Sequence, residues 1–240
     1  MSHVIIIGGG AAGMMAAIAA AGAGHKVCIY EKNEKLGKKI YITGKGRCNV
    51  TNACDTEELF RNVVHNAKFL YSSFYTFTNT DVMDLIEKHG CPLKTERGGR
   101  VFPVSDKSSD VIHALTVALR ELGVEVELHE EVSGVLAEDG HVSGVRLKRG
   151  QKVVPADAVI VTTGGLSYPS TGSTGDGYRF ATELGHTITE LSPALVPFEA
   201  KEAVCKDLQG LSLRNISVQI RNGKKRSEEH TFELQSLFAI

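Results

Sequence analysis

The sequence predicts an α/β protein: a parallel β-sheet covered on both faces, in three layers, followed by the first strands of a β-rich unit. Residues 3–31 contain a strand, a glycine-rich turn, a helix and a second strand, which favours a parallel sheet flanked by helices. Residues 132–155 contain three short strands separated by polar turns, which is typical of an antiparallel meander. The apolar run at 157–165 then returns to the pattern of a buried parallel strand.

The N-terminal unit begins with residues 3–7 (HVIII), which are apolar and β-branched like a buried parallel strand. An Ala-rich segment that ends near Gly24 predicts a helix. Residues 26–31 (KVCIYE) predict a second strand that ends in the acid Glu31. The turn between the first strand and the helix carries the glycines of a G-x-G-x-x-G motif, which are Gly8, Gly10 and Gly13.

This order of elements predicts a dinucleotide site. The first glycine allows a tight turn, the second lets the backbone approach a pyrophosphate, and the third lets the helix pack against the strand. The helix N-terminus presents free N–H groups to the phosphates. Glu31 is expected to accept hydrogen bonds from ribose hydroxyls, which suits FAD or NAD and disfavours a 2′-phosphate. The alternative is a turn that serves packing alone, with Glu31 as a solvated strand end.

The segment after the second strand favours FAD over a nicotinamide cofactor. A plain nicotinamide-binding domain would continue with another short crossover, whereas residues 32–54 form a long loop. Loops of that length are uncommon without a function. The sequence contains no second full dinucleotide motif, so any NAD(P)H is expected to bind only transiently.

The middle of the chain is expected to insert helices beside the nucleotide unit, over about residues 55–90. The predicted helices are 56–77 and 79–90. The elements expected next are short strands within 92–96 and 100–105, an amphipathic helix over 108–123 with a serine cap and a glycine stop, and a strand at 124–128.

The meander at 132–155 and the buried strand in DAVIVTTGG (157–165) follow. A meander placed before a parallel strand that ends in Thr-Thr-Gly is typical of FAD/NAD(P)-binding Rossmann-like domains of the glutathione-reductase type. Residues 170–186 predict a Gly/Ser/Thr loop that runs into a helix. This loop either contacts a flavin or serves only as the helix start, with Asp176 in the first turn.

Composition narrows the classes of partner. The chain is 42% hydrophobic and 23% charged with a net charge of −1, so it resembles an ordinary globular protein with no field that attracts nucleic acid or an anionic membrane. No apolar run is long enough to span a bilayer, and the N-terminal apolar segment lacks the flanks of a signal peptide. The scattered cysteines, without a C-x-x-C pair or zinc-finger spacing, predict no metal site and a reducing cytoplasm. The sequence leaves the oligomeric state open.

Several longer stretches carry a family resemblance. They are VIIIGGGAAGMMAAI, EKNEKLGKKIYITGKGRCNVTN, GRVFPVS, VTTGGLSYPSTGSTGDGY and SPALVPF, which together span most of residues 3–198. With these motifs the chain resembles the bacterial FAD-dependent flavoproteins of the HI0933-like group, which include aminoacetone-oxidase-like enzymes and bile-acid enone reductases. The resemblance implies that the loop GKGRCNVTN lies along FAD and near its ring.

The resemblance also implies roles for individual residues. The pyrophosphate would be lined by the glycine-rich turn, the adenosine ribose would be bound by the acid after the second strand, and the adenine would meet the backbone at the start of the meander. The residues implied to bind the cofactor are Gly8, Gly10, Ala11, Ala12, Gly13, Glu31, Lys32, Lys38, Gly46, Arg47, Cys48, Asn49, Val132, Thr163 and Gly164.

Two residues of the loop are the candidates for a catalytic role. Arg47, or Lys45 nearby, could stabilise the charge that a flavin gains on reduction. Its alternative is phosphate binding or a solvated loop charge. Cys48 could be redox active if Arg47 lowered its pKa. Its alternative is a small residue packed at the base of the loop.

The end of the chain departs from the family pattern, which continues much further. We expect a Rossmann-like FAD domain over 1–190, the first strands of an incomplete β-barrel-like domain over 191–225, and a non-native tail over 226–240. RSEEHTFELQS (226–236) is similar to a translated sequencing adapter, and a natural divergent tail is the alternative. A chain that stopped here would leave strand edges exposed and would fold poorly or bind FAD weakly.

Three readings of function follow. The first is an FAD-dependent oxidoreductase that acts on a small organic substrate by hydride transfer through flavin, with O₂ or NAD(P)H as the second partner. The second is a non-catalytic or RNA-modifying flavoprotein, which the absence of a basic surface disfavours. The third is an NAD-only dehydrogenase, which the long loop and the meander disfavour.

Overall fold

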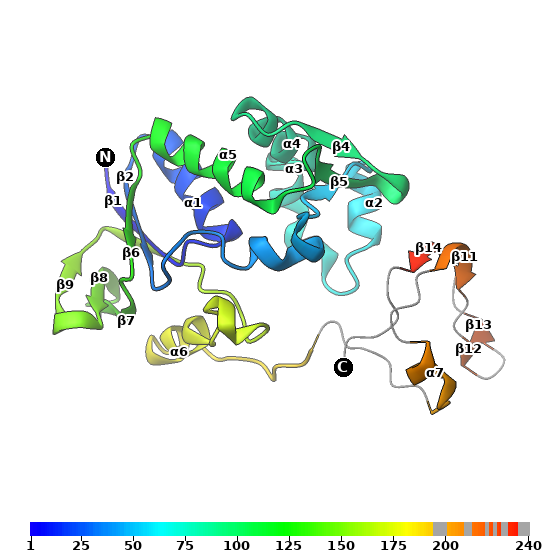
Figure 1. The fold of residues 1–240 in the computed structure, drawn as a ribbon. Helices are drawn as coiled ribbons and strands as arrows, with labels where there is room; N and C mark the ends of the chain where they lie inside the picture. Colours follow the sequence, from blue (N-terminus) through cyan, green and yellow to red (C-terminus); the bar gives the residue numbers. More distant parts are fainter. Residues whose placement is uncertain (194–200, 209–212, 219–220, 223–224, 227–229, 235–240) are drawn as a thin grey trace. The chain divides into compact units, whose positions relative to one another are not determined.

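The computed structural model describes residues 1–193, 201–208, 213–218, 221–222, 225–226 and 230–234. The chain forms two compact units, Met1–Ile188 and Thr189–Ile240, each of which is considered by itself (Figure 1). No helix of the described part is long and apolar enough to cross a membrane.

The first unit is built on a four-stranded sheet in the order β10-β1-β2-β6, and all of its pairings are parallel. Its strands are β1 (His3–Ile7), β2 (Lys26–Glu31), β6 (Glu125–Leu128) and β10 (Ala158–Val161). All four strands were predicted, and the parallel sheet is confirmed.

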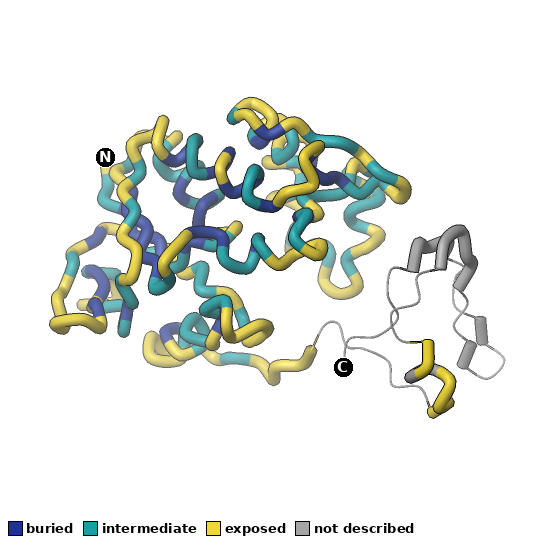
Figure 2. Tube along the Cα trace, in the orientation of Figure 1, coloured by how far each residue is buried: buried dark blue, intermediate teal, exposed yellow. Residues whose placement is uncertain are grey.

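Alternate side chains of the two central strands enter two separate cores, because successive residues of a strand point to opposite faces. On one face, Val4, Ile6 and Ile29 pack with helices α1 (Ala11–Gly22) and α5 (Ser108–Glu121). On the other face, strand side chains pack with the meander and with helix α6 (Asp176–Glu183), the set being Ile5, Ile7, Cys28, Tyr30, Val145 and Phe180. The predicted three layers are confirmed, and Figure 2 shows buried positions where Figure 1 places the central strands.

The meander forms a separate antiparallel sheet in the order β7-β8-β9, as predicted. Its strands are β7 (Val132–Glu138), β8 (His141–Leu147) and β9 (Val153–Pro155). A third small sheet, β3-β5-β4, joins Thr51–Asn52, Arg100–Pro103 and Leu93–Thr95.

The single helix predicted over 56–77 is wrong in its continuity. The structure has three short pieces, α2 (Thr56–Arg61), η2 (Ala67–Leu70) and α3 (Tyr71–Thr76). The break is local, because Asn66 before η2 takes the left-handed conformation that asparagine tolerates better than most residues. The next predicted helix is confirmed as α4 (Asn79–Lys88).

Two further predictions are corrected. Ser108 does not cap α5: Lys107 precedes the helix, while the buried hydroxyl of Ser108 donates to the carbonyl of Tyr41. The glycine stop at Gly123 is confirmed by its φ of +68°.

Strand β10 is not buried at its end, because Val161 is 41% exposed on a strand at the edge of the described sheet. The long loop after β2 is interrupted by the 3₁₀ segment η1 (Ile40–Gly46).

Among its described residues, the second unit contains α7 (Val204–Asp207) and two strand pairs. Strand β11 (Leu213–Val218), predicted within 213–225, pairs antiparallel with β14 (His230–Leu234), and β12 (Arg221–Asn222) pairs with β13 (Lys225–Arg226). Most of SPALVPF (192–198) lies outside the described residues, as does part of 226–240. The expected domain boundaries and the non-native origin of the tail stay predictions.

Candidate functional site

A pocket of about 380 Å³ lies within the first unit, where β1, β2 and β10 reach their carboxyl ends. Ligands of open parallel sheets bind at this edge. Its volume falls in the range of small-molecule sites. The residues that line it come from the glycine-rich turn, the segment after β2, the start of β7, and the segment between β10 and α6.

The glycine-rich turn forms one wall. Gly8 has a φ of +102°, and a Cβ there would lie 2.7 Å from the carbonyl oxygen of Thr162. A Cβ on Gly13 would lie 1.8 Å from the carbonyl oxygen of Gly8, so the helix and the strand approach each other as closely as the motif predicts. Gly10 differs, because no heavy atom lies within 4 Å of its Cβ position. The backbone at Gly10, a lining residue, therefore borders open space.

Glu31 is the last residue of β2 and contacts the glycine-rich turn. Its buried carboxylate accepts from the backbone N–H of Gly9 at 2.7 Å, and from both the backbone N–H and the side-chain amide of Asn33 at 2.8 and 2.7 Å. A carboxylate offers about four lone-pair positions, so roughly one remains for a ligand hydroxyl. Glu31 is thus neither a solvated strand end nor a fully open acceptor.

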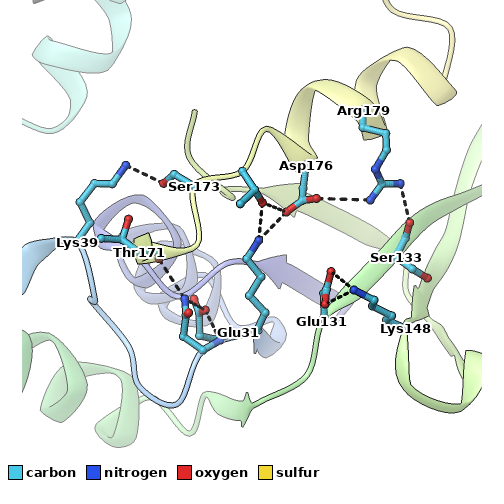
Figure 3. A network of polar contacts seen from close by, with 12 residues as sticks. Glu31, Lys39, Glu131, Ser133, Lys148, Thr171, Ser173, Asp176 and Arg179 are labelled. Carbon is cyan, nitrogen blue, oxygen red and sulfur yellow. Dashed lines mark hydrogen bonds and ion pairs between the residues drawn. The ribbon is translucent and has the colours of Figure 1, made fainter. Parts of the chain in front are cut away.

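Polar side chains cross from the segment after β2 to the segment before α6 (Figure 3). Lys32 Nζ donates to Asp176 Oδ2 at 2.8 Å and to Thr174 Oγ1 at 2.7 Å. Lys39 Nζ donates to Ser173 Oγ at 2.7 Å. Burial raises the pKa of Asp176, but the bonds from Lys32 and Thr174 outweigh it and lower that pKa overall. The aspartate is therefore held ionised at the pocket rim.

Thr163, two residues after β10, has a polar atom without a partner. Its Oγ1 is buried and accepts or donates no hydrogen bond among the described residues. A buried hydroxyl without a partner costs about 1–3 kcal/mol. Thr163 lines the pocket, and a hydroxyl without a partner beside it is compatible with a polar atom of a bound ligand. This orphan hydroxyl and the open space at Gly10 fit a dinucleotide cofactor.

Comparison with known families shows to which family the chain belongs. The model of the HI0933-like protein Rossmann domain matches residues 2–228. The chain belongs to the HI0933-like family.

Two relatives of this HI0933-like chain have named activities. The 3-dehydro-bile acid delta(4,6)-reductase of Clostridium scindens is 33% identical over 239 residues, which cover 98% of this chain and 56% of the relative. The ribosomal RNA dihydrouridine synthase of Escherichia coli is 31% identical over 208 residues, which cover 87% of this chain and 50% of the relative. The chain therefore spans about half the length of these relatives.

Solved structures support the fold of the HI0933-like domain. A 3-ketosteroid delta1-dehydrogenase from Sterolibacterium denitrificans matches with a TM-score of 0.59 at 15% identity, covering 77% of this chain and 55% of that one. A 3-ketosteroid-delta4-(5alpha)-dehydrogenase from Rhodococcus jostii RHA1 matches with a TM-score of 0.55 at 16% identity, covering 77% and 54%. At these identities the likeness shows a shared fold.

The structure brings most of the expected site residues of the HI0933-like chain to one pocket. Those that line it are Gly8, Gly10, Ala11, Ala12, Glu31, Lys32, Lys38, Val132, Thr163 and Gly164. Those that do not line it are Gly13, Gly46, Arg47, Cys48 and Asn49. Gly13 supports the turn from behind, and the other four lie in the GKGRCN loop.

Arg47 forms its contacts with the small sheet β3-β5-β4 and with residues next to its strands. Its guanidinium donates to both carboxylate oxygens of Glu96 and to Asp106 Oδ1 at 2.7 and 2.8 Å, and its Cζ lies 4.1 Å from the ring centre of Phe102. The hydrogen bonds that Arg47 donates to Glu96 and Asp106 raise its pKa. In this arrangement Arg47 holds its loop to the β4–β5 hairpin and does not point its charge at the pocket.

Cys48 packs in the helix-side core, 6% exposed, with a φ of +60°. Burial raises the pKa of the Cys48 thiol, and a hydrogen bond with Thr43 offsets this only in part. A raised pKa disfavours the thiolate, so the environment is that of a structural cysteine. This favours the packing alternative over a reactive thiol.

The lining residues that sequence reasoning missed include four polar ones, Asn33, Lys39, Thr171 and Ser173. The neighbouring lysines 38 and 39 signal a basic loop, but the sequence alone does not indicate which one reaches the opposite wall. Asn33 follows Glu31 by two residues, a spacing that in retrospect suits a side chain folding back onto a strand-end acid. Thr171 and Ser173 lie in the Gly/Ser/Thr loop at 170–186, for which the sequence offered a flavin contact or a helix start without indicating which residues face the pocket.

No group of three His, Cys, Asp or Glu side chains in the described ranges could hold a metal ion.

Proposed function

We propose that the pocket binds the ADP half of FAD and that this chain is the cofactor-binding part of an FAD-dependent oxidoreductase. The observation that carries the proposal is the meeting, in one pocket, of the open turn at Gly10 and the partnerless hydroxyl of Thr163. Family membership supports it independently.

The lining residues have distinct tasks in this proposal. The turn at Gly10, Ala11 and Ala12 would hold the pyrophosphate, because N–H groups at a helix start carry partial positive charge. The free acceptor position of Glu31 would take a ribose hydroxyl. The backbone at Val132 would meet the adenine.

FAD, when bound, supplies hydride transfer, and the protein supplies position and electrostatics. The chain itself therefore need not contain a general base, and no lining residue is assigned that role. We infer a small organic substrate, with O₂ or NAD(P)H as the second redox partner. The bile-acid reductase among the relatives supports a small molecule as substrate.

A second candidate function is RNA modification. It is favoured by two relatives named ribosomal RNA dihydrouridine synthases, at 31% and 32% identity. A net charge of −1 disfavours it, because RNA-binding surfaces are usually basic. Re-oxidation of the chemically reduced holoprotein separates the two readings. A steroid enone that restores the flavin bands supports the small-molecule reading, and restoration by a uridine-containing RNA alone supports the second.

The primary test is the visible absorption spectrum of the purified protein, followed by chromatography of the cofactor released on denaturation. Flavin bands and released FAD are the expected result. A protein that lacks flavin, and that binds NAD but not added FAD, would overturn the proposal in favour of a nicotinamide enzyme. A flavoprotein that exchanges no electrons with any substrate, O₂ or NAD(P)H would favour a non-catalytic role.

We also infer a cytoplasmic location without a membrane partner. The four cysteines whose side chains the structure describes are free, which suits a reducing compartment. Fractionation of the producing cell tests this, with recovery in the membrane or the medium as the contrary result.

A further inference from the structure

Residues 164–175, between β10 and α6, form a wall of the pocket and are called the strap. Gly164 at one end has a φ of +76° and Gly175 at the other has a φ of +83°. Thr171, Gly172 and Ser173 face the pocket from the middle of the strap. A ligand that fills the pocket therefore contacts both the glycine-rich turn and the strap.

The strap is held to the opposite side by polar bonds from one short segment. Within the described residues, its side-chain and backbone bonds to elements other than itself and α6 come from Lys32, Asn33 and Lys39. Asn33 donates to the carbonyl of Thr171 at 3.1 Å, and Lys32 to the hydroxyl of Thr174 at 2.7 Å. All of these donors follow β2, across the pocket from β10.

Lys39 makes two of these bonds and reaches both halves of the strap. Its ammonium donates to the hydroxyl of Ser173 at 2.7 Å (Figure 3). It also donates to the carbonyl of Ser167 at 2.8 Å. Ser173 is buried, so losing the ammonium would leave its hydroxyl without that partner.

Apolar packing contributes little to holding the strap. Its large apolar side chains, Leu166 and Tyr168, are 54% and 65% exposed, and neither belongs to a core of the described structure. A segment with few buried apolar contacts and partly exposed hydrogen bonds opens locally at low free-energy cost. The glycines at its ends can absorb the backbone change that opening needs.

We propose that Lys39 is a positioning residue that latches the strap across the pocket, so that release of the latch sets how fast FAD leaves, an inference that rests on the proposed function. Lys39 acts through the strap and not on the substrate. Removing its ammonium deletes two charge-assisted bonds at once, and every open state of the strap becomes more populated.

Hydrogen–deuterium exchange of the cofactor-free protein tests the latch without any ligand. Lys39→Met keeps the side-chain length and removes the charge, and we expect exchange in peptides covering 164–175 to rise about tenfold. Exchange in β1 should not change. The matched control is Lys35→Met, in the same segment, whose ammonium lies over the Tyr41 ring at 4.2 Å and, among the described residues, forms no bond to the strap. Unchanged exchange in the strap of Lys39→Met would overturn the latch.

Ser173→Ala provides a milder second variant, should Lys39→Met fold poorly. It removes one of the two bonds, so its exchange should lie between wild type and Lys39→Met. Exchange equal to wild type in Ser173→Ala would count against the latch.

The rate of FAD release tests the consequence. Loaded protein is diluted and the rise in flavin fluorescence is followed, with release expected to be about tenfold faster for Lys39→Met and unchanged for Lys35→Met. Equal release from wild type and Lys39→Met would overturn the control of release. A wild-type protein that takes up no FAD would defeat the proposed function, and the exchange experiment would still decide the latch.

Discussion

The carboxylate of Glu31 accepts a hydrogen bond from the backbone N–H of Gly9 at 2.7 Å, which ties the end of β2 to the glycine-rich turn. The acid expected to bind a ribose is thus also part of the frame that shapes the phosphate wall. The same carboxylate holds Asn33, whose amide reaches the carbonyl of Thr171 on the strap. One buried side chain therefore links the turn, the strand end and the far wall.

Glu31→Gln is expected to lower the free energy of unfolding by about 1–3 kcal/mol, because an amide donor replaces an acceptor among buried N–H groups. Urea unfolding measures this. Glu125→Gln is the control, since Glu125 forms an exposed pair with Lys26 and should change stability by less than about 0.5 kcal/mol. Equal, small effects of the two variants would contradict the proposed role of Glu31 in the frame.

Gly10→Ala is expected to fold normally and to lose most FAD binding. Gly10 has a φ of −77°, which alanine adopts readily, and its methyl would enter the open space that the pyrophosphate needs. Isothermal titration with FAD or ADP measures the loss, expected to be at least about tenfold. Gly22→Ala is the matched control in the same helix, also with open space around its Cβ position, and should gain about 0.5–1 kcal/mol of stability without a change in binding.

Gly13→Ala should behave differently from Gly10→Ala. Its methyl would meet backbone, at 1.8 Å from the carbonyl oxygen of Gly8, so the turn itself must shift. We expect a lower urea midpoint together with weaker FAD binding. A Gly13→Ala protein as stable as wild type would show that α1 and β1 can separate without cost.

Arg47→Met is expected to destabilise the fold by about 1 kcal/mol, a figure kept low because the cluster around it is partly solvent-exposed. Arg47→Lys should recover little, since lysine lacks the planar fork that bonds Glu96 and Asp106 and stacks on Phe102. Urea unfolding gives the stability, and titration with ADP gives the binding. If Arg47→Met were as stable as wild type but had lost FAD binding, the result would support a role for Arg47 in contacting the cofactor.

Stability should fall as pH rises above 9. Burial raises the pKa of Cys28 from 9.0 to about 11, and burial likewise raises that of Cys91 to about 11. As the pH rises, the thiols lose their protons in the unfolded chain before they do so in the folded chain. Their contribution to the stability of the folded state is therefore complete below pH 9 and is lost as pH rises through 11. Each thiol contributes up to roughly 2–3 kcal/mol over this window. Urea unfolding from pH 7 to 11 measures the slope, and Cys28→Ala should make it shallower; a parallel slope would refute the assignment.

Cys48 is expected to resist alkylation in the folded protein. Burial raises the pKa of both thiols, but Cys48 is buried whereas Cys54 is only half-buried and so more accessible to the reagent. Treatment with iodoacetamide followed by peptide mass spectrometry should label Cys54 at least about tenfold faster than Cys48. Rapid labelling of Cys48 in the native state would revive its candidacy as a reactive thiol.

Local sequence determined the framework of this protein. The strands at 3–7 and 26–31, the turn at Gly8 and Gly10, and the meander at 132–155 were all predictable, because each depends on periodicity, β-branched residues or glycine conformation within a few residues. The pocket's position followed as well, since parallel strands that carry these motifs must bring their carboxyl ends to one edge.

Only the tertiary structure decided the partners of the polar side chains. Arg47 and Cys48 belong to a loop whose motif suggested a place at the cofactor, yet Arg47 meets Glu96 and Asp106 and Cys48 enters the core. Lys39 reaches Ser167 and a buried hydroxyl on the strap, far along the chain. Burial, charge pairing and the direction of a long side chain depend on which distant segments pack together, and no local pattern encodes that choice.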